Sequence, residues 1–215
     1  MKDIVIYGAG GLGREVACLI NAINDVNLQW NLVGFIDDGL SVGTQVSHYG
    51  KVLGGKNFLL SKNKPISVVI SIGSPKVVKQ IVEELSKNSF ILFPNLVYPS
   101  LRFADRETFK IGVGNVIKHD CGFSCDIKIG NFNLLNGGVV FGHDVEIGDF
   151  NTFMPDVRIS GEVKIGCGNF LGVGSIVLQQ VIIDENVRLG AASVMIRKPK
   201  NGELYIGNPA KIVKL

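Results

Sequence analysis

The sequence predicts a chain of two parts, an α/β half with a small parallel sheet followed by an all-β parallel solenoid. Two observations carry this prediction. A glycine-rich turn, Gly8 to Gly13, separates a strand-like run from a helix-like run near the start of the chain. From Ile111 onward, apolar residues recur at every sixth position. Because the two patterns do not overlap, we predict one domain over residues 1–100 and a second over residues 101–215.

In the first half, short β-branched or aromatic runs alternate with segments of helical periodicity. The order is strand, glycine turn, helix and strand, and then a further strand, helix and strand, which favours a small parallel, Rossmann-like sheet. The first helix begins after the glycine turn, and the second follows Gly73-Ser74-Pro75. The expected strands cover residues 4–7, 32–36, 68–72 and 91–93.

In the second half, the six-residue period runs without interruption. At an overall hydrophobic fraction of 46%, an unbroken run of this length is not a chance event. A period of six fits a parallel solenoid in which each short strand turns one side chain inward, so that three such turns make one coil of about 18 residues. The apolar positions are Ile111, Ile117, Phe123, Ile129, Leu135, Phe141, Ile147, Phe153, Ile159, Ile165, Leu171, Val177, Ile183, Leu189 and Met195.

Composition excludes several classes of function. The net charge of +3 comes from dispersed Lys and Arg rather than from a basic block, so we expect no nucleic-acid binding. No apolar stretch is long enough to span a membrane and no signal peptide is apparent, so we expect a cytoplasmic protein with reduced cysteines. Cys121 and Cys125 lie near His119, but no second ligand pair accompanies them, and we expect no metal.

The repeats resemble those of the hexapeptide-repeat acyltransferases, which implies that the solenoid is a left-handed parallel β-helix. In such a coil, residues one full coil apart stack on one face at the strand spacing. The chain has three histidines. His48 lies in a polar segment, whereas His119 and His143 both follow an apolar position by two residues. Because the interval between His119 and His143 is not a whole number of coils, these two belong to different faces.

His143 is the preferred candidate for a catalytic base. Asp144 follows it and could orient the imidazole, while Gly161 lies one coil onward and leaves the space above His143 open. Transfer of an acyl group from a thioester needs a base for the attacking amine or hydroxyl and a donor for the developing oxyanion. A backbone N–H at Gly161 would supply that donor.

Three segments make the resemblance more specific: residues 141–148, residues 160–166 and Gly207-Asn208-Pro209-Ala210-Lys211. They resemble the family of sialic acid O-acetyltransferases and bacterial nucleotide-sugar N-acetyltransferases of the bacillosamine type. The resemblance implies a homotrimer with acetyl-CoA between adjacent solenoids, a role in polysaccharide biosynthesis, and His143 as base. It implies acetyl-CoA contacts at Thr152, Val173 and Ala191. Thr152 stands where the bacillosamine enzymes have a second histidine, half a coil from His143, and so could meet it only across a subunit boundary.

An exposed apolar surface also favours association. We expect Val140, Val157 and Val173 on the outer faces, where an isolated solenoid would leave them in water.

The glycine turn admits two interpretations. The pattern G-x-G-x-x-G, followed by Asp37 at the end of the next strand, is typical of dinucleotide sites and would favour an NAD-binding redox or sensing module. Glycines at a helix start bind any phosphate, however, and this half is too short for a full dinucleotide fold. We therefore expect a nucleotide-sugar site and N-acetylation of a nucleotide-linked amino sugar, with O-acetylation of a sialic-acid-type sugar as the alternative. The expected substrate contacts are Gly10, Gly11, Leu12, Asp37, Asp38 and Gly73.

Overall fold

The computed structural model describes residues 1–214, which divide into two compact units, Met1–Pro99 and residues 100–214. Each unit is described on its own. In the first, five parallel strands form one sheet in the order β3-β2-β1-β4-β5. The strands are β1 (Lys2–Tyr7), β2 (Trp30–Ile36), β3 (Val52–Gly54), β4 (Ile66–Ile70) and β5 (Ile91–Leu92); the short strand β6 (Leu96–Val97) follows.

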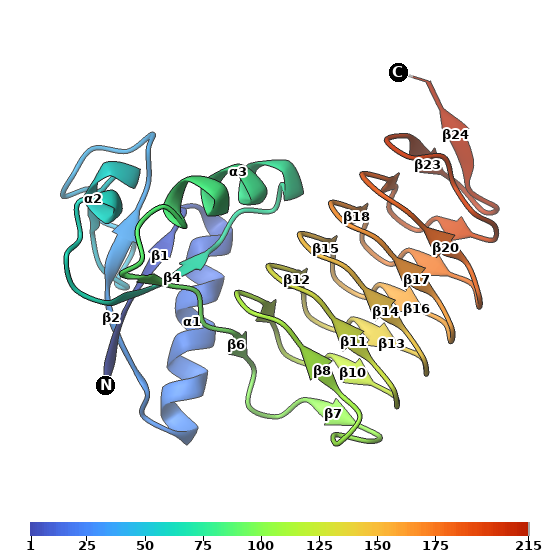
Figure 1. Cartoon of the computed structure of the whole chain (residues 1–215), viewed down its shortest axis with the longest axis horizontal. Helices are drawn as coiled ribbons and strands as arrows, with labels where there is room; N and C mark the ends of the chain where they lie inside the picture. The colour runs from blue at the N-terminus through green and yellow to red at the C-terminus, as the bar shows by residue number, and fades with distance from the viewer. Residues whose placement is uncertain (215) are drawn as a thin grey trace. The chain divides into compact units, whose positions relative to one another are not determined.

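Three helices accompany this sheet: α1 (Gly11–Val26), α2 (Lys56–Leu60) and α3 (Pro75–Leu85) (Figure 1). The two expected helices are α1 and α3, and each buries the apolar stripe that its period predicts. Strand β3 and helix α2 were not expected. Strand β3 has only three residues and ends in Gly54, so its sequence carries too little alternation to be recognised.

Close backbone packing explains the glycines of the turn between β1 and α1. Gly8 has φ +108°, and a Cβ there would lie 2.7 Å from Ser71 Oγ. A Cβ on Gly13 would lie 2.1 Å from the carbonyl oxygen of Gly8. The turn is therefore pressed against both the segment after β4 and the first turn of α1, and no larger residue fits these two positions.

The second unit is a parallel solenoid with three sheet faces, which we call sheets I, II and III (Figure 1). Sheet I contains β7 (Arg102–Phe103), β10 (Gly122–Phe123), β13 (Val140–Phe141), β16 (Arg158–Ile159), β19 (Ile176–Val177) and β22 (Val194–Met195). Sheet II contains β8 (Lys110–Ile111), β11 (Lys128–Ile129), β14 (Glu146–Ile147), β17 (Lys164–Ile165) and β20 (Ile182–Ile183). Sheet III contains β9 (Val116–Ile117), β12 (Leu134–Leu135), β15 (Thr152–Phe153), β18 (Phe170–Leu171), β21 (Arg188–Leu189), β23 (Leu204–Ile206) and β24 (Lys211–Val213).

From β7 to β22, the register has the expected length of one coil. Phe123 pairs with Phe141 and Ile129 pairs with Ile147, each partner lying one coil onward. At the end of the unit, β24 pairs with β23 antiparallel and departs from this repeat. The predicted fold class, a small parallel α/β sheet followed by a left-handed parallel β-helix, is confirmed. Within the described residues, no helix has the length and apolar character needed to cross a membrane.

Each six-residue repeat buries two side chains rather than one. Besides the apolar position, the residue two places before it also points inward, because alternate residues of an extended segment face the same side. Val139, Val145 and Val163 are fully buried in this way. Val157 belongs to the same set with no exposed surface, so its expected place on the outer face is wrong. Val140 is half-buried, and Val173 is 45% exposed.

At the corner that precedes sheet III, the second inward position holds a ladder of buried asparagines. Asn115, Asn133, Asn151 and Asn169 have no exposed surface. The Nδ2 of Asn151 donates to Asn133 Oδ1 at 3.0 Å and to the carbonyl of Gly166 at 2.9 Å. Its Oδ1 in turn accepts hydrogen bonds from the backbone N–H and from the Nδ2 of Asn169. The ladder thus pairs buried amides across successive coils at a fixed spacing.

Replacing the middle of the ladder should cost stability. In Asn151→Leu, the Asn169 amide and the Gly166 carbonyl lose their partners inside the core, and at about 1–3 kcal/mol for each unpaired buried group we expect a loss of about 3 kcal/mol. Urea unfolding followed by circular dichroism measures it. The matched control is Asn63→Leu at an exposed position, which should change stability by less than about 0.5 kcal/mol. Equal losses in both variants would contradict the role of the ladder.

Candidate functional site

His143 stands at the corner between sheets I and II, directly after β13. Its Nδ1 lies 2.8 Å from Asp144 Oδ2, and 48% of its side chain is exposed. Asp144 has φ +57°, a conformation that Asp tolerates, and its N–H donates to the carbonyl of Cys125 at 3.1 Å. The carboxylate is therefore fixed by the corner itself and holds the imidazole by one nitrogen. The other nitrogen, Nε2, lies on the side of Gly161.

Gly161 lies against the imidazole ring one coil onward. A Cβ on Gly161 would stand 2.5 Å from His143 Nε2 and 2.7 Å from Cε1, so the ring occupies the space that any side chain would need. Within residues 1–214, the Gly161 N–H has no hydrogen-bond partner. The corner therefore combines a histidine held by a carboxylate with a backbone donor beside the same ring, as the sequence predicted.

Glu162 adds a negative charge that the sequence did not reveal. The side-chain amides of Gln180 and Gln179, at 3.0 and 2.9 Å, lower the pKa of Glu162, and the nearby His143 lowers it further. Glu162 lies one coil beyond Asp144, just as Gly161 lies one coil beyond His143. The sequence spacing that placed Gly161 could therefore have placed Glu162 as well.

The other expected acetyl-CoA contacts lie on different parts of the solenoid. Thr152 belongs to β15 of sheet III, is 2% exposed, and pairs in register with Leu134 and Phe170. Val173 and Ala191 are both exposed at the corner between sheets III and I, one coil apart. The single chain therefore does not bring Thr152, Val173 or Ala191 to His143.

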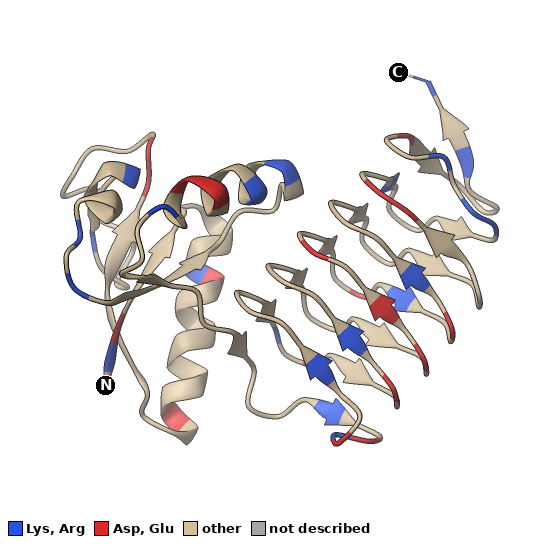
Figure 2. Ribbon diagram, viewed as in Figure 1, with Lys and Arg blue, Asp and Glu red and all other residues tan. Residues whose placement is uncertain are grey.

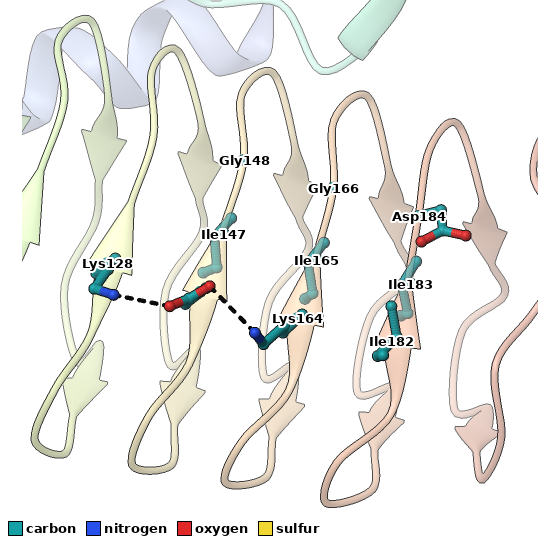
Figure 3. A pocket seen from close by; sticks show the side chains of 10 residues that line it. Lys128, Ile147, Gly148, Lys164, Ile165, Gly166, Ile182, Ile183 and Asp184 are labelled. Atoms are coloured by element: carbon teal, nitrogen blue, oxygen red, sulfur yellow. Dashed lines mark hydrogen bonds and ion pairs between the residues drawn. The ribbon is translucent and has the colours of Figure 1, made fainter.

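A charged row on sheet II begins beside this corner (Figure 2). Glu146 lies between two lysines, 2.8 Å from Lys128 Nζ and 3.7 Å from Lys164 Nζ, and this pairing lowers the pKa of Glu146 (Figure 3). A hollow of about 410 Å³ adjoins the row and is lined in part by Asp144. A second hollow of about 560 Å³ lies further along sheet II, where Ile165, Ile183 and Asp184 are among its lining residues.

In the first unit, the expected substrate residues gather at one edge of the sheet. Gly10, Gly11 and Leu12 open helix α1, whose N-terminus has neither a side-chain cap nor an acidic residue in its first turn. Its N–H groups and the positive end of its dipole therefore suit an anion. Gly73 follows β4, and a Cβ there would meet nothing within 4 Å.

The two aspartates after β2 have structural partners. Asp37 Oδ2 accepts the Ala9 N–H at 3.0 Å and so ties the glycine turn to the neighbouring strand. Asp38 accepts a short hydrogen bond from the Tyr7 hydroxyl and a second from the Lys56 N–H at 2.8 Å. Burial, together with this bond to Asp38, raises the pKa of Tyr7. Asp38 is itself exposed and keeps a face toward solvent.

The cysteines near His119 do not form a metal centre among the described residues. Cys121 is fully buried, and burial raises the pKa of its thiol to about 11, which leaves it protonated near neutral pH. No three His, Cys, Asp or Glu side chains gather as a metal-binding group in residues 1–214.

Comparison with known proteins gives this site a context. Residues 3–85 match the PglD N-terminal domain family. WeeI from Acinetobacter baumannii AYE has a structure with a TM-score of 0.86 at 28% identity, over 99% of this chain and 100% of that one. The match over the first unit and the similarity of fold along the whole chain support the bacillosamine-type hexapeptide acetyltransferase family. The predicted family, the hexapeptide-repeat acetyltransferases, is thereby confirmed.

Two other solved structures share the fold along their whole length. The acetyltransferase domain of PglB from Neisseria gonorrhoeae FA1090 has a TM-score of 0.88 at 24% identity, over 99% of this chain and 100% of that one. Perosamine N-acetyltransferase from Caulobacter crescentus, solved with CoA and GDP-perosamine, has a TM-score of 0.86 at 22% identity, over 100% and 98%. No protein of curated function matches the sequence.

Adding one methyl group at Gly161 should displace the His143 ring and lower activity without unfolding the solenoid. In Gly161→Ala, the Cβ would overlap the His143 ring, which is half-exposed and can swing away, so we expect acyl transfer to fall by about 10²-fold or more with little loss of stability. The melting temperature and the rate of thiol release, measured together, test this.

The matched control is Gly122→Ala on sheet I. Its Cβ would meet Val140 at an ordinary 3.5 Å, so activity should be retained. A Gly161→Ala protein that is as active as this control would show that the ring position is unimportant.

Proposed function

We propose that the chain transfers an acetyl group from acetyl-CoA to the amino group of a nucleotide-linked amino sugar, with His143 as the base. The observation that carries the proposal is the arrangement at one corner: an imidazole held through Nδ1 by Asp144, with the side-chain-free Gly161 against its ring. These are the base and the oxyanion donor that acyl transfer needs.

His143, Gly161 and Asp144 each have a separate role in the transfer. The amine of the sugar attacks the thioester carbonyl and forms the new C–N bond. At the same time His143 Nε2 takes a proton from the amine. The Gly161 N–H stabilises the oxyanion, which collapses with cleavage of the C–S bond, and the proton passes from His143 to the departing CoA thiolate. Asp144 holds the imidazole through Nδ1 and so orients Nε2 for the proton transfer.

For the donor, we propose that acetyl-CoA runs along the exposed corner that carries Val173 and Ala191. Because this corner differs from that of His143, one chain cannot offer both to a single acetyl-CoA, and the proposal includes a homotrimer whose clefts combine two subunits. Thr152 is nearly enclosed in the single chain, so we do not assign it a contact with the acetyl group. CoA-bound relatives of the same fold support the donor.

For the acceptor, we propose that the diphosphate of a nucleotide sugar binds at the N-terminus of α1. Gly10, Gly11 and Leu12 would offer backbone N–H groups, and Gly73 would leave room beside them. Asp37 shapes the turn through Ala9, whereas the exposed Asp38 would reach the ribose or base. The NAD-binding alternative is not retained, because the sheet of the first unit has five strands and lacks the second half of a dinucleotide fold.

The proposal predicts thiol release from acetyl-CoA with a UDP-, dTDP-, GDP- or CMP-linked amino sugar, GDP-perosamine among them. His143→Asn should lower kcat by about 10²–10⁴-fold. His48→Asn is the matched control and should leave the rate unchanged, since the His48 ring lies in an exposed segment with its centroid 3.9 Å from that of the Tyr49 ring.

The mass spectrum of the product distinguishes transfer to nitrogen from transfer to oxygen, because mild alkali removes only an O-acetyl group. An alkali-labile product would favour the O-acetylation alternative. No thiol release with any of these sugars would overturn the proposed acceptor class, and an unchanged rate in His143→Asn would overturn the proposed base.

A further inference from the structure

A second histidine–aspartate pair repeats the geometry of the first. His119 Nδ1 lies 2.8 Å from Asp120 Oδ2, the same separation as between His143 and Asp144. Asp120 has φ +59°, against +57° for Asp144. The side chains of His119 and Asp120 are 60% and 77% exposed. The pair therefore reproduces the local conformation of the corner at His143, with more of both side chains in solvent.

The glycine is repeated as well. Gly137 lies one coil beyond His119, and a Cβ there would stand 2.7 Å from His119 Cε1 and 3.0 Å from Nε2. Its backbone N–H has no hydrogen-bond partner within residues 1–214, as at Gly161. The neighbouring N–H of Gly138 donates to the His119 carbonyl, as that of Glu162 does to the His143 carbonyl. All three elements of the first centre are thus present in the second.

Turn chemistry accounts for only part of this arrangement. Asp126 and Asp156 also occupy corners with positive φ, so an aspartate at position 120 needs no further reason. Neither of them follows a histidine: Cys125 and Pro155 precede them. An ion pair this exposed contributes little stability, about 0–1 kcal/mol. The ion pair with Asp120 therefore gives little reason of stability for a histidine at position 119.

The second centre lies on a different corner of the prism. His119 follows β9 of sheet III and precedes β10 of sheet I, whereas His143 lies between sheets I and II. Successive steps of one coil lead from His119 through Gly137 and Pro155 to Val173 and Ala191. His119 is thus at the start of the corner along which the proposed function places the acyl donor.

We propose that His119, Asp120 and Gly137 form a second acyl-transfer centre, which acts on activated acetyl esters or thioesters with water or a small hydroxyl compound as acceptor. The acceptor oxygen bonds to the acyl carbon while His119 Nε2 takes its proton, and the Gly137 N–H stabilises the oxyanion. The bond to the leaving group then breaks, and the proton passes from His119 to the departing phenolate or thiolate. The centre rests on its own geometry and requires no nucleotide sugar.

Hydrolysis of p-nitrophenyl acetate by the full chain tests the proposal, because this ester needs neither acetyl-CoA nor a sugar. The chain has three histidines, so variants of each can be compared. In a His143→Gln background, adding His119→Gln should lower nitrophenolate release by about tenfold or more, whereas adding His48→Gln should change it by less than about twofold. Asp120→Asn should reduce the rate, and Gly137→Ala, whose Cβ would displace the ring, should reduce it further.

Equal effects of His119→Gln and His48→Gln would overturn the second centre, since His119 would then be no better than an ordinary surface imidazole. A parallel assay of thiol release from acetyl-CoA with GDP-perosamine separates the two proposals. Wild-type chain that releases no thiol but shows His119-dependent ester hydrolysis would reject the proposed function and support the second centre. The reverse pattern would reject the second centre alone.

Discussion

The backbone register that stacks each coil on the next is the constraint on which the solenoid depends. Each coil donates N–H groups to carbonyls of the next, as Gly122 does to Val139 and Val140 does to Val157. The buried asparagines act at the corner that precedes sheet III, where their side-chain amides bond both to one another and to the backbone. Because apolar contacts alone are compatible with small shifts, directional bonds in the core are what make one register uniquely favourable.

The candidate catalytic corner follows from this register. His143 meets Gly161 only because residues one coil apart lie one strand spacing from each other. The carboxylate of Asp144 is placed by a turn that needs a residue with positive φ, which Asp accepts at little cost. The polar groups of the site are therefore carried by turns, while the inward side chains that hold those turns take no part in the chemistry.

Periodicity made the solenoid predictable, and stacking arithmetic then placed Gly161 beside His143. Side-chain direction was harder to predict. Val157 was expected outside because only one inward position per repeat was counted, although the residue two places before each apolar position is buried as well. The asparagine ladder went unrecognised for the same reason, since a polar residue in such a position reads as exposed until its partners one coil away are known.

In the first unit, sequence located the glycine turn but not the roles of the acids around it. Asp37 was expected to bind the ligand directly, and its contact with the Ala9 N–H was not foreseen, because that bond joins two distant parts of the chain whose proximity depends on strand pairing. Strand β3 escaped notice for its shortness. The local sequence pattern thus predicts helices, strands and turns. Contacts between them become apparent only once the fold is known.

The fixed coil length also limits how such a chain can change in length. A single residue inserted between His143 and Gly161 would remove the stacking of the two and turn every later inward side chain outward within its repeat. An insertion of one whole coil elsewhere in the solenoid would leave both unchanged and would lengthen the prism by about 4.8 Å. Descendants of this sequence should therefore differ by whole coils or by loops that protrude from the solenoid at a corner. Each added coil should also add one asparagine to the ladder.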